Sequence, residues 1–330
     1  MDDQLRIAVL GGGSWATALV KIFSSNAPVS WWVRSIDDVA HIQRHHHNPR
    51  YLSDVELHMD RIDLHSDLMT VVKQADILVL AVPSAFMVDA LAPLKDILKT
   101  KRVISAVKGI VPETHQIVGE YLRDHMGLDM AHFGAIVGAC HAEEVALERL
   151  SYLTVAAQDG DLAKAMAKRL QTDHVHVSTM DDVVGCEYAA VLKNIYAIAA
   201  GLAHGLGYGD NFQAVLVSNA QREMKRFMKA VYPMKRKITH PAYSSDLFVT
   251  MYSPFSRNRT LGHLVGKGYS LKSAMAEIGM VAEGYYAAKH IWEVKKDRAV
   301  KMPVASAVHK VLYRNMPPQK ALQILANKLI

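Results

Sequence analysis

The sequence predicts an α/β protein in which a doubly wound, mostly parallel sheet is followed by an all-helical domain. Two observations carry this prediction. Through residues 1–182, short runs of Val, Ile and Leu alternate with stretches at helical spacing, as in parallel sheets covered by helices on both faces. From residue 183 to residue 330 the pattern is helical, with no run typical of a strand. The change near Asp181 predicts the boundary between domains 1–182 and 183–330, and 330 residues suffice for two domains.

The expected strands of the first domain are short and apolar. Amphipathic or Ala-rich segments such as Ala85–Leu98 and Leu162–Leu170 lie between them and predict helices. The expected strands are Leu5–Leu10, Val29–Val33, Ile77–Val82, Val103–Val107, Gly134–Val137 and Tyr152–Ala156.

A glycine-rich turn follows the first expected strand. The segment Gly11-Gly12-Gly13-Ser14-Trp15-Ala16 fits the pattern G-x-G-x-x-G/A, and helix-forming residues come next. Gly11 allows a sharp turn, Gly13 lets a pyrophosphate approach the backbone, and Ala16 lets the helix pack on the strand. Because the first amides of a helix favour negative charge, the turn predicts a Rossmann-like dinucleotide site that includes Gly11 and Gly13. A tight turn without a ligand is the alternative.

The second expected strand ends in Arg34. Proteins that prefer NAD usually carry Asp or Glu about 20 residues after the glycines, where the carboxylate binds the ribose hydroxyls. An arginine there can pair with a 2′-phosphate and removes the anion that would repel one. Arg34 therefore predicts that the protein accepts NADP, and prefers it over NAD. Stacking of the guanidinium on the adenine is the alternative.

Composition excludes several classes of protein. The chain is 50% hydrophobic and 21% charged, which rules out a disordered or collagen-like chain. The two cysteines, Cys140 and Cys186, are too few for a disulfide framework. Its apolar runs are strand-sized, and the N-terminus shows no signal peptide, so we expect a cytoplasmic protein without a membrane span. We expect a homodimer only because two-fold dimers are the commonest assemblies of soluble proteins.

Charge is divided unevenly along the chain. Residues 1–182 hold 17 Lys and Arg against 24 Asp and Glu, whereas residues 183–330 hold 21 against 8. A basic second half indicates an anionic ligand or a polyanionic partner. Nucleic acid is not expected, because Lys235-Arg236-Lys237 is the only tight basic run and is not interleaved with aromatic residues. No metal site is expected either, since the consecutive His45–His47 point in different directions and precede a turn signal.

Three polar segments stand out as candidates for chemistry. Lys108 follows an apolar strand and precedes a glycine, so its ammonium is expected at the carboxyl edge of the sheet. Lys193, beside Asn194, lies in an apolar helix, where a lysine is costly to bury unless it is paired or used. Ser256-Arg257-Asn258-Arg259 suits a phosphate dianion, and Asp246 lies nearby.

Together these segments resemble the bacterial-type NAD(P)-dependent glycerol-3-phosphate dehydrogenases over nearly the full length of the chain. The number, order and spacing of the shared motifs make this resemblance specific. The matching segments are Gly11–Trp15, Asn48–Leu52, Ala81–Ser84, Lys108–Ile110, His141–Ala146, Leu192–Asn194, Ala197–Gly201, Gly205–Asn211, Ser256–Arg259 and Glu283-Gly284.

The resemblance implies interconversion of dihydroxyacetone phosphate and sn-glycerol 3-phosphate, a small phosphorylated substrate that supplies phospholipid synthesis. It implies that Lys193, with Asp246, is the catalytic acid/base. Substrate contacts are implied at Lys108, Gly138, Cys140, Lys193, Asp246, Ser256, Arg257 and Asn258. Cofactor contacts are implied at Ser14, Trp15, Arg34, Lys108, Ala142, Arg257, Val281 and Glu283, besides Gly11 and Gly13.

Elementary chemistry agrees with these roles. Hydride transfer to a ketone builds negative charge on its oxygen, so a cationic proton donor at that atom lowers the barrier. The chain departs from the family at two places. It carries Cys140 where a serine or threonine is usual, and Ser244-Ser245 where the family has a glycine-rich stretch. Two alternatives remain: a related hydroxyacid or phosphogluconate dehydrogenase, and a catalytically silent NADP-binding sensor.

Overall fold

The computed structural model describes residues 5–329 of the 330-residue chain. Their contacts divide the chain into two compact units. The first contains the described residues up to Val107 together with Val118–Val183, and the second contains Lys108–Ile117 and the residues from Val184 onward. The short segment Lys108–Ile117 therefore packs with the helical unit, although the chain on both sides of it belongs to the sheet.

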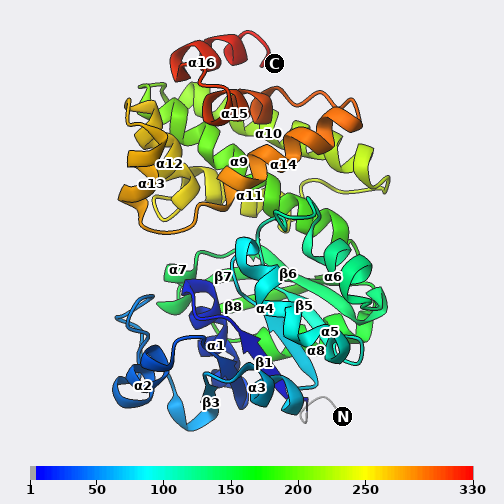
Figure 1. The fold of residues 1–330 in the computed structure, drawn as a ribbon. Helices are drawn as coiled ribbons and strands as arrows, with labels where there is room; N and C mark the ends of the chain where they lie inside the picture. The colour runs from blue at the N-terminus through cyan, green and yellow to red at the C-terminus, as the bar shows by residue number, and fades with distance from the viewer. Residues whose placement is uncertain (1–4, 330) are drawn as a thin grey trace. The chain divides into compact units, whose positions relative to one another are not determined.

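One eight-stranded sheet forms the middle of the first unit (Figure 1). Its strand order is β3-β2-β1-β4-β5-β6-β7-β8, and every neighbouring pair is parallel except β6 and β7. The chain builds outward from β1 in both directions, which confirms the predicted doubly wound, mostly parallel sheet. The strands are β1 (Ile7–Leu10), β2 (Val29–Trp32), β3 (Ile62–His65), β4 (Ile77–Leu80), β5 (Arg102–Ser105), β6 (Phe133–Ala139), β7 (Ser151–Ala157) and β8 (Val175–Met180).

The sequence analysis did not anticipate β3 and β8, the two edge strands. In β3, buried Ile62 and Leu64 alternate with Asp63 and His65. Only Val175 is fully buried in β8. The expected strands were continuous apolar runs, and such runs belong to the central strands of a sheet, which are covered on both faces.

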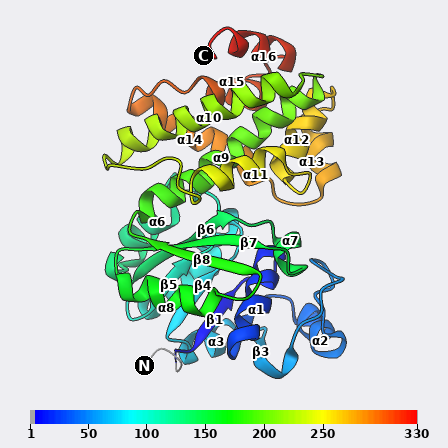
Figure 2. The same ribbon diagram turned by 180° about the vertical axis from the view of Figure 1, so that it is seen from behind.

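Helices cover both faces of this sheet. Helices α1 and α8 pack together on one face, and α4, α5 and α6 lie over the other (Figures 1 and 2). The expected helix over Leu162–Leu170 is confirmed as part of α8. The helices of this unit are α1 (Ser14–Asn26), α2 (Ile36–His45), α3 (Leu68–Gln74), α4 (Met87–Leu91), α5 (Lys95–Leu98), α6 (Val118–Met126), α7 (Ala142–Ala146) and α8 (Gly160–Leu170).

The single helix expected over Ala85–Leu98 is wrong. This stretch is divided between α4 and α5, with three-residue 3-10 turns at Ser84–Phe86 and Ala92–Leu94. Pro93 lies in the second turn. A proline provides no backbone N–H and clashes with the preceding turn, so it interrupts a continuous α-helix at this point.

The second unit contains helices and loops, without a strand between Val184 and Leu329. This confirms the predicted change to helical structure. The helices are α9 (Val183–Gly205), α10 (Asp210–Val231), α11 (Ser244–Tyr252), α12 (Arg257–Gly266), α13 (Leu271–Ile278), α14 (Glu283–Asp297), α15 (Pro303–Tyr313) and α16 (Pro318–Ala326).

Helix α9 is the central helix of this unit. Among the described residues it is the one helix long and apolar enough to cross a membrane by length and composition, with a mean hydropathy of 1.3. However, 94% of that window is buried inside the protein. Packing against its neighbours therefore accounts for the apolar surface of α9.

Helices α9 and α12 touch backbone to backbone through glycines. A Cβ atom at Gly201 would lie 2.0 Å from the carbonyl oxygen of Arg259, and one at Gly262 would lie 2.1 Å from that of Ile198. One turn further along, a Cβ at Gly205 would lie 2.4 Å from the carbonyl oxygen of His263. These distances leave no room for a side chain, so glycine is required on both helices.

We predict that Gly262→Ala lowers the free energy of unfolding by about 2 kcal/mol, because the two helices must separate to admit the methyl group. This net loss combines a cost of about 3 kcal/mol for separating the helices with a gain of about 1 kcal/mol from the better helix propensity of alanine. Denaturant unfolding measures the change. The control is Gly209→Ala in the same unit, where a Cβ meets nothing within 4 Å. Equal stability of the two variants would contradict the close approach.

Candidate active site

The glycine-rich turn joins β1 to α1 in the first unit. Gly11 has a φ of +136°, and a Cβ there would lie 2.6 Å from the carbonyl oxygen of Ala81, so only glycine fits. Gly13 is the N-cap of α1, and a Cβ on it would meet nothing within 4 Å. Ser14 and Trp15 form the first turn of α1. Within the described chain this helix has neither a side-chain cap nor an acidic residue in its first turn, so its positive end suits a phosphate ligand.

Two buried side chains form hydrogen bonds to the backbone of this turn. The indole Nε1 of buried Trp31 donates to the carbonyl oxygen of Gly11 at 2.6 Å. Asn48, also buried, donates through Nδ2 to the carbonyl oxygen of Gly12 at 3.1 Å and to Thr17 Oγ1 at 2.9 Å. The sequence analysis assigned Asn48 only to a family motif. These bonds fix the turn before any ligand binds.

Arg34 follows β2 at the same edge of the sheet as the glycine turn. Strands β1 and β2 are parallel neighbours, so both end at that edge. The Arg34 side chain is exposed and forms no ion pair with residues 5–329. Ser35 next to it caps α2 by accepting a hydrogen bond from the Asp38 amide at 3.1 Å. The guanidinium is therefore available to a ligand.

Strand β6 also ends at this edge. Gly138 is its penultimate residue, Cys140 follows the strand, and Ala142 begins α7. Gly138 has a φ of +133°, and a Cβ there would lie 2.4 Å from the carbonyl oxygen of Tyr152. The Cys140 thiol is buried and donates to the carbonyl oxygen of Gly138 at 3.2 Å. The thiol thus stabilises its own loop, in agreement with an inert side chain.

A buried ion pair joins α9 to α11 in the second unit. Lys193 is 4% exposed and Asp246 is 2% exposed, and Lys193 Nζ donates to Asp246 Oδ1. Thr250 Oγ1, one turn along α11, donates to the carbonyl oxygen of Asp246 at 2.7 Å. The second carboxylate oxygen, Asp246 Oδ2, is buried without a hydrogen-bond partner among the described residues. An acceptor left in this state costs free energy, which indicates that a ligand group completes it.

The segment that carries Lys108 is tied to the same helices. Asn194 Nδ2, next to Lys193, donates to the carbonyl oxygen of Lys108 at 2.8 Å. Further along the segment, the His115 ring contacts the buried His290 ring on α14, with centroids 4.3 Å apart. Burial lowers the pKa of His290 to about 4, so its ring is neutral at pH 7. The sequence analysis missed this pair, since nothing local links positions 175 residues apart.

The predicted phosphate-binding residues begin α12. Ser256 is its N-cap and accepts a hydrogen bond from the Arg259 amide at 3.3 Å. Asn258 Oδ1 accepts from the Gly284 amide at 2.8 Å. Because Oδ1 is engaged, the amide group of Asn258 presents its Nδ2 donors, which make no hydrogen bond with the described residues.

Arg257 connects these residues to the start of α14. Its Nη1 donates to the carbonyl oxygen of Val281 at 3.1 Å, and its side chain is exposed. Glu283 is the first residue of α14. A Cβ at the next residue, Gly284, would lie 2.6 Å from the carbonyl oxygen of Asn194, so the start of α14 contacts α9 directly.

The structure therefore brings the candidate residues together in two sets, one in each unit. The first set is Gly11, Gly13, Ser14, Trp15, Arg34, Gly138, Cys140 and Ala142. The second is Lys108, Lys193, Asp246, Ser256, Arg257, Asn258, Val281 and Glu283. Thr250 was missed, although its spacing of four from Asp246 on a helix was visible in the sequence.

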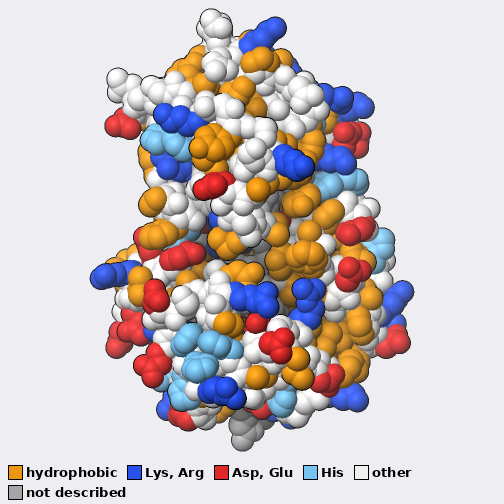
Figure 3. All heavy atoms as spheres, turned by 60° about the vertical axis from the view of Figure 1, so that its left-hand side comes forward, with side chains coloured by type: hydrophobic (Ala, Val, Ile, Leu, Met, Phe, Trp, Pro, Cys, Tyr) orange, Lys and Arg blue, Asp and Glu red, His pale blue; other side chains and the backbone are white. Residues whose placement is uncertain are grey.

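The consecutive histidines lie at the end of α2. The rings of His41, His45 and His47 form a cluster with centroids 4.5 to 6.0 Å apart, while His46 takes a φ of +61° as the C-cap. Figure 3 shows histidine side chains gathered on the surface. Within residues 5–329 no group of three or more His, Cys, Asp or Glu side chains has the geometry of a metal site.

Comparison with known proteins covers both units. The family described as NAD-dependent glycerol-3-phosphate dehydrogenase matches residues 6–163 with its N-terminal model and 182–323 with its C-terminal model. A glycerol-3-phosphate dehydrogenase (NAD(P)+) 2 of Salinibacter ruber is 35% identical over 327 residues, covering 98% of this chain and 94% of the relative. The glycerol-3-phosphate dehydrogenase (NAD(P)+) of Staphylococcus haemolyticus is 32% identical, and 98% of each chain is covered. The crystal structure of glycerol-3-phosphate dehydrogenase from Coxiella burnetii has a TM-score of 0.91 at 28% identity, with 98% of each chain covered.

The glycine turn allows a test that separates folding from binding. We predict that Gly13→Ala leaves thermal stability nearly unchanged but weakens NADPH binding about tenfold or more, because a pyrophosphate must approach the backbone where the methyl group stands. Isothermal titration calorimetry measures the affinity. Gly209→Ala is the matched control, since Gly209 is also an extended helix N-cap with open space at its Cβ position. Unchanged affinity in Gly13→Ala would exclude this turn as the phosphate site.

Proposed function

This chain belongs to the NAD-dependent glycerol-3-phosphate dehydrogenase family of oxidoreductases, which interconvert dihydroxyacetone phosphate and sn-glycerol 3-phosphate, and we propose that Lys193 is its proton-transferring group. The observation that carries this proposal is the buried ion pair of Lys193 with Asp246. The Lys193 ammonium is 4% exposed, and the Asp246 carboxylate holds its position. The free Asp246 Oδ2 supports a ligand hydroxyl next to it.

The proposed mechanism moves one proton between Lys193 and the substrate. When bound, the nicotinamide cofactor supplies the hydride to C2 of the ketone or accepts it from the alcohol. Lys193 Nζ donates its proton to the C2 oxygen as negative charge builds there, and takes the proton back in the oxidation direction. Asp246 orients Nζ and stabilises its charged form, while a second cation at Lys108 favours its deprotonation.

We propose that the start of α12 holds the substrate phosphate. Arg257 provides a guanidinium fork, and Asn258 presents Nδ2 donors because its Oδ1 is engaged by Gly284. Ser256 contributes mainly as the helix cap that fixes this geometry. We propose that Gly138 and Cys140 face the substrate through their backbone and the size of their side chains. The Cys140 thiol itself already donates to the Gly138 carbonyl oxygen. Binding energy at the phosphate then positions C2 for reaction.

The first unit is proposed to hold the dinucleotide. Gly11, Gly13, Ser14 and Trp15 would take the pyrophosphate at the start of α1, and Arg34 would pair with a 2′-phosphate, so that NADP is preferred over NAD. Further proposed cofactor contacts are Ala142 in the first unit and Lys108, Arg257, Val281 and Glu283 in the second.

We further propose a homodimer in the cytoplasm that supplies glycerol phosphate for phospholipids. Two-fold pairs are the commonest soluble assemblies. Cys140 and Cys186 are both buried and form no disulfide, which supports a reducing compartment. The lipid role rests on the family.

We predict that Lys193→Met reduces turnover of dihydroxyacetone phosphate with NADPH by about 100-fold or more, because the forming alkoxide loses its proton donor. NADPH absorbance measures the rate, and calorimetry checks that NADPH still binds. Since Lys193→Met leaves Asp246 buried and unpaired, Lys193→Met combined with Asp246→Asn serves as a second variant that avoids this charge. Lys289→Met, an exposed lysine on α14, is the control.

Three outcomes would contradict parts of this proposal. Near-normal turnover in a folded Lys193 variant would exclude its catalytic role. Turnover by the unmodified protein that does not need the phosphate ester would favour a hydroxyacid dehydrogenase. NADPH binding without turnover of any substrate would favour the silent sensor.

For the cofactor we predict that Arg34→Ala lowers the ratio of kcat/KM for NADPH to that for NADH by about tenfold or more, mostly through the KM for NADPH. The change is expected because the 2′-phosphate loses its charged partner. Steady-state kinetics with both cofactors measure it, and Arg44→Ala on α2 is the control. An equal loss with NADPH and NADH would instead assign Arg34 to stacking on the adenine.

A further inference from the structure

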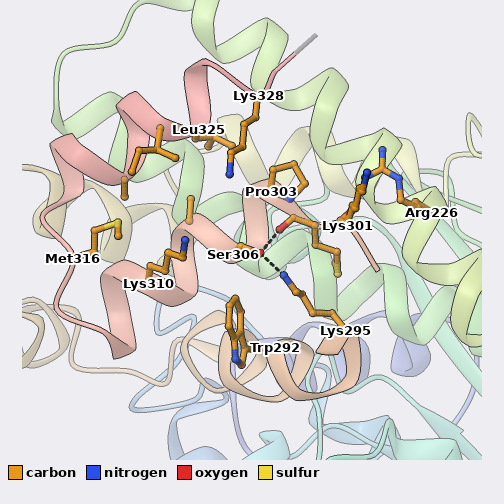
Figure 4. Close-up of a pocket in the computed structure, with 14 residues that line it drawn as sticks. Arg226, Trp292, Lys295, Lys301, Pro303, Ser306, Lys310, Met316, Leu325 and Lys328 are labelled. Carbon is orange, nitrogen blue, oxygen red and sulfur yellow. Dashed lines mark hydrogen bonds between the residues drawn. The ribbon is translucent and has the colours of Figure 1, made fainter. Parts of the chain in front are cut away.

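A basic cavity lies at the C-terminal end of the helical unit, between α10, α14, α15 and α16 (Figure 4). Its volume is about 540 Å³, within the range of about 300–1,000 Å³ that is typical of small-molecule sites. Of the residues that line it, five are cationic and none is acidic. The cations are Arg226, Lys295, Lys301, Lys310 and Lys328.

Three lysines line the cavity close to one another, and one of them contacts a hydroxyl. Lys295 Nζ donates to Ser306 Oγ at 2.7 Å, and Figure 4 shows the side chains of Lys310 and Lys328 directed into the cavity. Burial lowers the pKa of Lys295, and the nearby Lys310 and Lys328 lower it further against the opposing effect of Glu223. None of the five cations forms an ion pair with a carboxylate in residues 5–329. Like charges gathered without a counter-ion are costly, and a bound anion would remove that cost.

The nearest buried carboxylate offsets these cations only in part. Glu223 on α10 accepts hydrogen bonds from the amides of Val304 at 2.8 Å and Ala305 at 2.9 Å, at the start of α15. Burial raises its pKa to about 7, so at neutral pH the carboxyl is only partly charged. That partial charge is shared between the two amides at the helix start and the nearby Lys295 and Arg226.

The rest of the lining is largely apolar. Met316, Ile324 and Leu325 lie on the α16 side of the cavity, and Ile324 is 37% exposed. A fully solvated anion site would not need such a surface, whereas a ligand with an aliphatic part would cover it. The cavity thus combines a cationic end with an apolar wall.

The cavity is separate from the candidate active site of the same unit. Helix α14 carries Glu283 and Gly284 at its start and Trp292 and Lys295 near its end. The twelve residues from Glu283 to Lys295 rise by about 18 Å along the helix. A ligand in the cavity therefore does not occupy the proposed phosphate site at Asn258.

We propose that this cavity binds an anionic amphiphile with a phosphate head and an aliphatic tail. The head lies among Lys295, Lys310 and Lys328 at Ser306, and the tail lies along Met316, Ile324 and Leu325. A soluble alkyl phosphate and the headgroup of a phosphate-bearing lipid share this chemistry.

Direct binding tests the proposal on the full-length protein. Isothermal titration calorimetry with n-octyl phosphate, below its aggregation concentration, is performed in the Arg257→Ala background, so that binding at the proposed substrate site does not contribute. We expect saturable binding that is at least about tenfold tighter than that of inorganic phosphate. Binding of both probes with equal affinity would overturn the role of the apolar wall.

Variants in the same background locate the ligand. Lys310→Gln with Lys328→Gln should weaken octyl phosphate binding by about tenfold or more, because two charge-assisted contacts are lost. The matched control, Lys320→Gln with Lys272→Gln, removes the same charge from exposed helix positions outside the lining. Ile324→Ser should weaken octyl phosphate by about threefold or more but leave inorganic phosphate unchanged. Equal affinities in the lysine pair and its control would overturn the site.

A vesicle experiment distinguishes the two sources of the phosphate head. Co-sedimentation with phosphatidate-containing vesicles is expected to fall in the Lys310→Gln, Lys328→Gln variant if a lipid headgroup enters the cavity, and octyl phosphate should compete with it. No vesicle binding beside tight octyl phosphate binding would assign the cavity to a soluble ligand. Vesicle binding without any octyl phosphate binding would mean that the lysines act as a general basic surface, and would overturn the proposal.

Discussion

The close approach of α9 and α12 is the constraint on which the helical unit depends. Glycines on both helices remove the side chains that would otherwise separate the backbones, because a Cβ at Gly201 or Gly262 would fall about 2 Å from a carbonyl oxygen of the other helix. Helix α9 carries Lys193, and α12 begins at Arg257. Any larger residue at these glycines would move the proposed phosphate-binding residues away from the proposed proton donor. The glycines thus set the geometry of the site without contacting a ligand.

The buried Lys193–Asp246 pair joins α9 to a different neighbour, α11. Removing two charges from water costs several kcal/mol for each ion, and their attraction repays this only with good geometry and further hydrogen bonds. Thr250 supplies one such bond to the backbone of Asp246, but Asp246 Oδ2 remains without a partner among the described residues. A structural pair would be expected to satisfy both oxygens. The incomplete shell is better explained by a site that a substrate hydroxyl completes, so stability is given up where the chemistry is proposed.

Local sequence patterns predicted much of the first unit, but contacts between residues distant in the chain could not be predicted from the sequence. The central strands and the turn at Gly11 follow from patterns within about ten residues. Edge strands β3 and β8 were missed because their polar positions interrupt the apolar pattern, and one expected helix breaks at Pro93. The support of the turn by Trp31 and the contact of His115 with His290 join residues distant in the chain. For Lys193 and Asp246, the family resemblance supplied the pairing that spacing alone leaves open.

The excess positive charge of the second half also has a different distribution from the one that the sequence suggested. The sequence analysis took that charge to indicate an anionic ligand or a polyanionic partner, and Lys108, Arg257 and Lys193 fit the proposed phosphorylated substrate and dinucleotide. Five other cations, however, line a separate cavity about 18 Å further along α14, with no acidic neighbour in its lining. Solvation explains isolated surface lysines well, but it does not explain why five cations line one cavity beside an apolar wall. One anionic substrate site therefore does not use all the cations of this unit, and the proposed second anion would balance those that line the cavity.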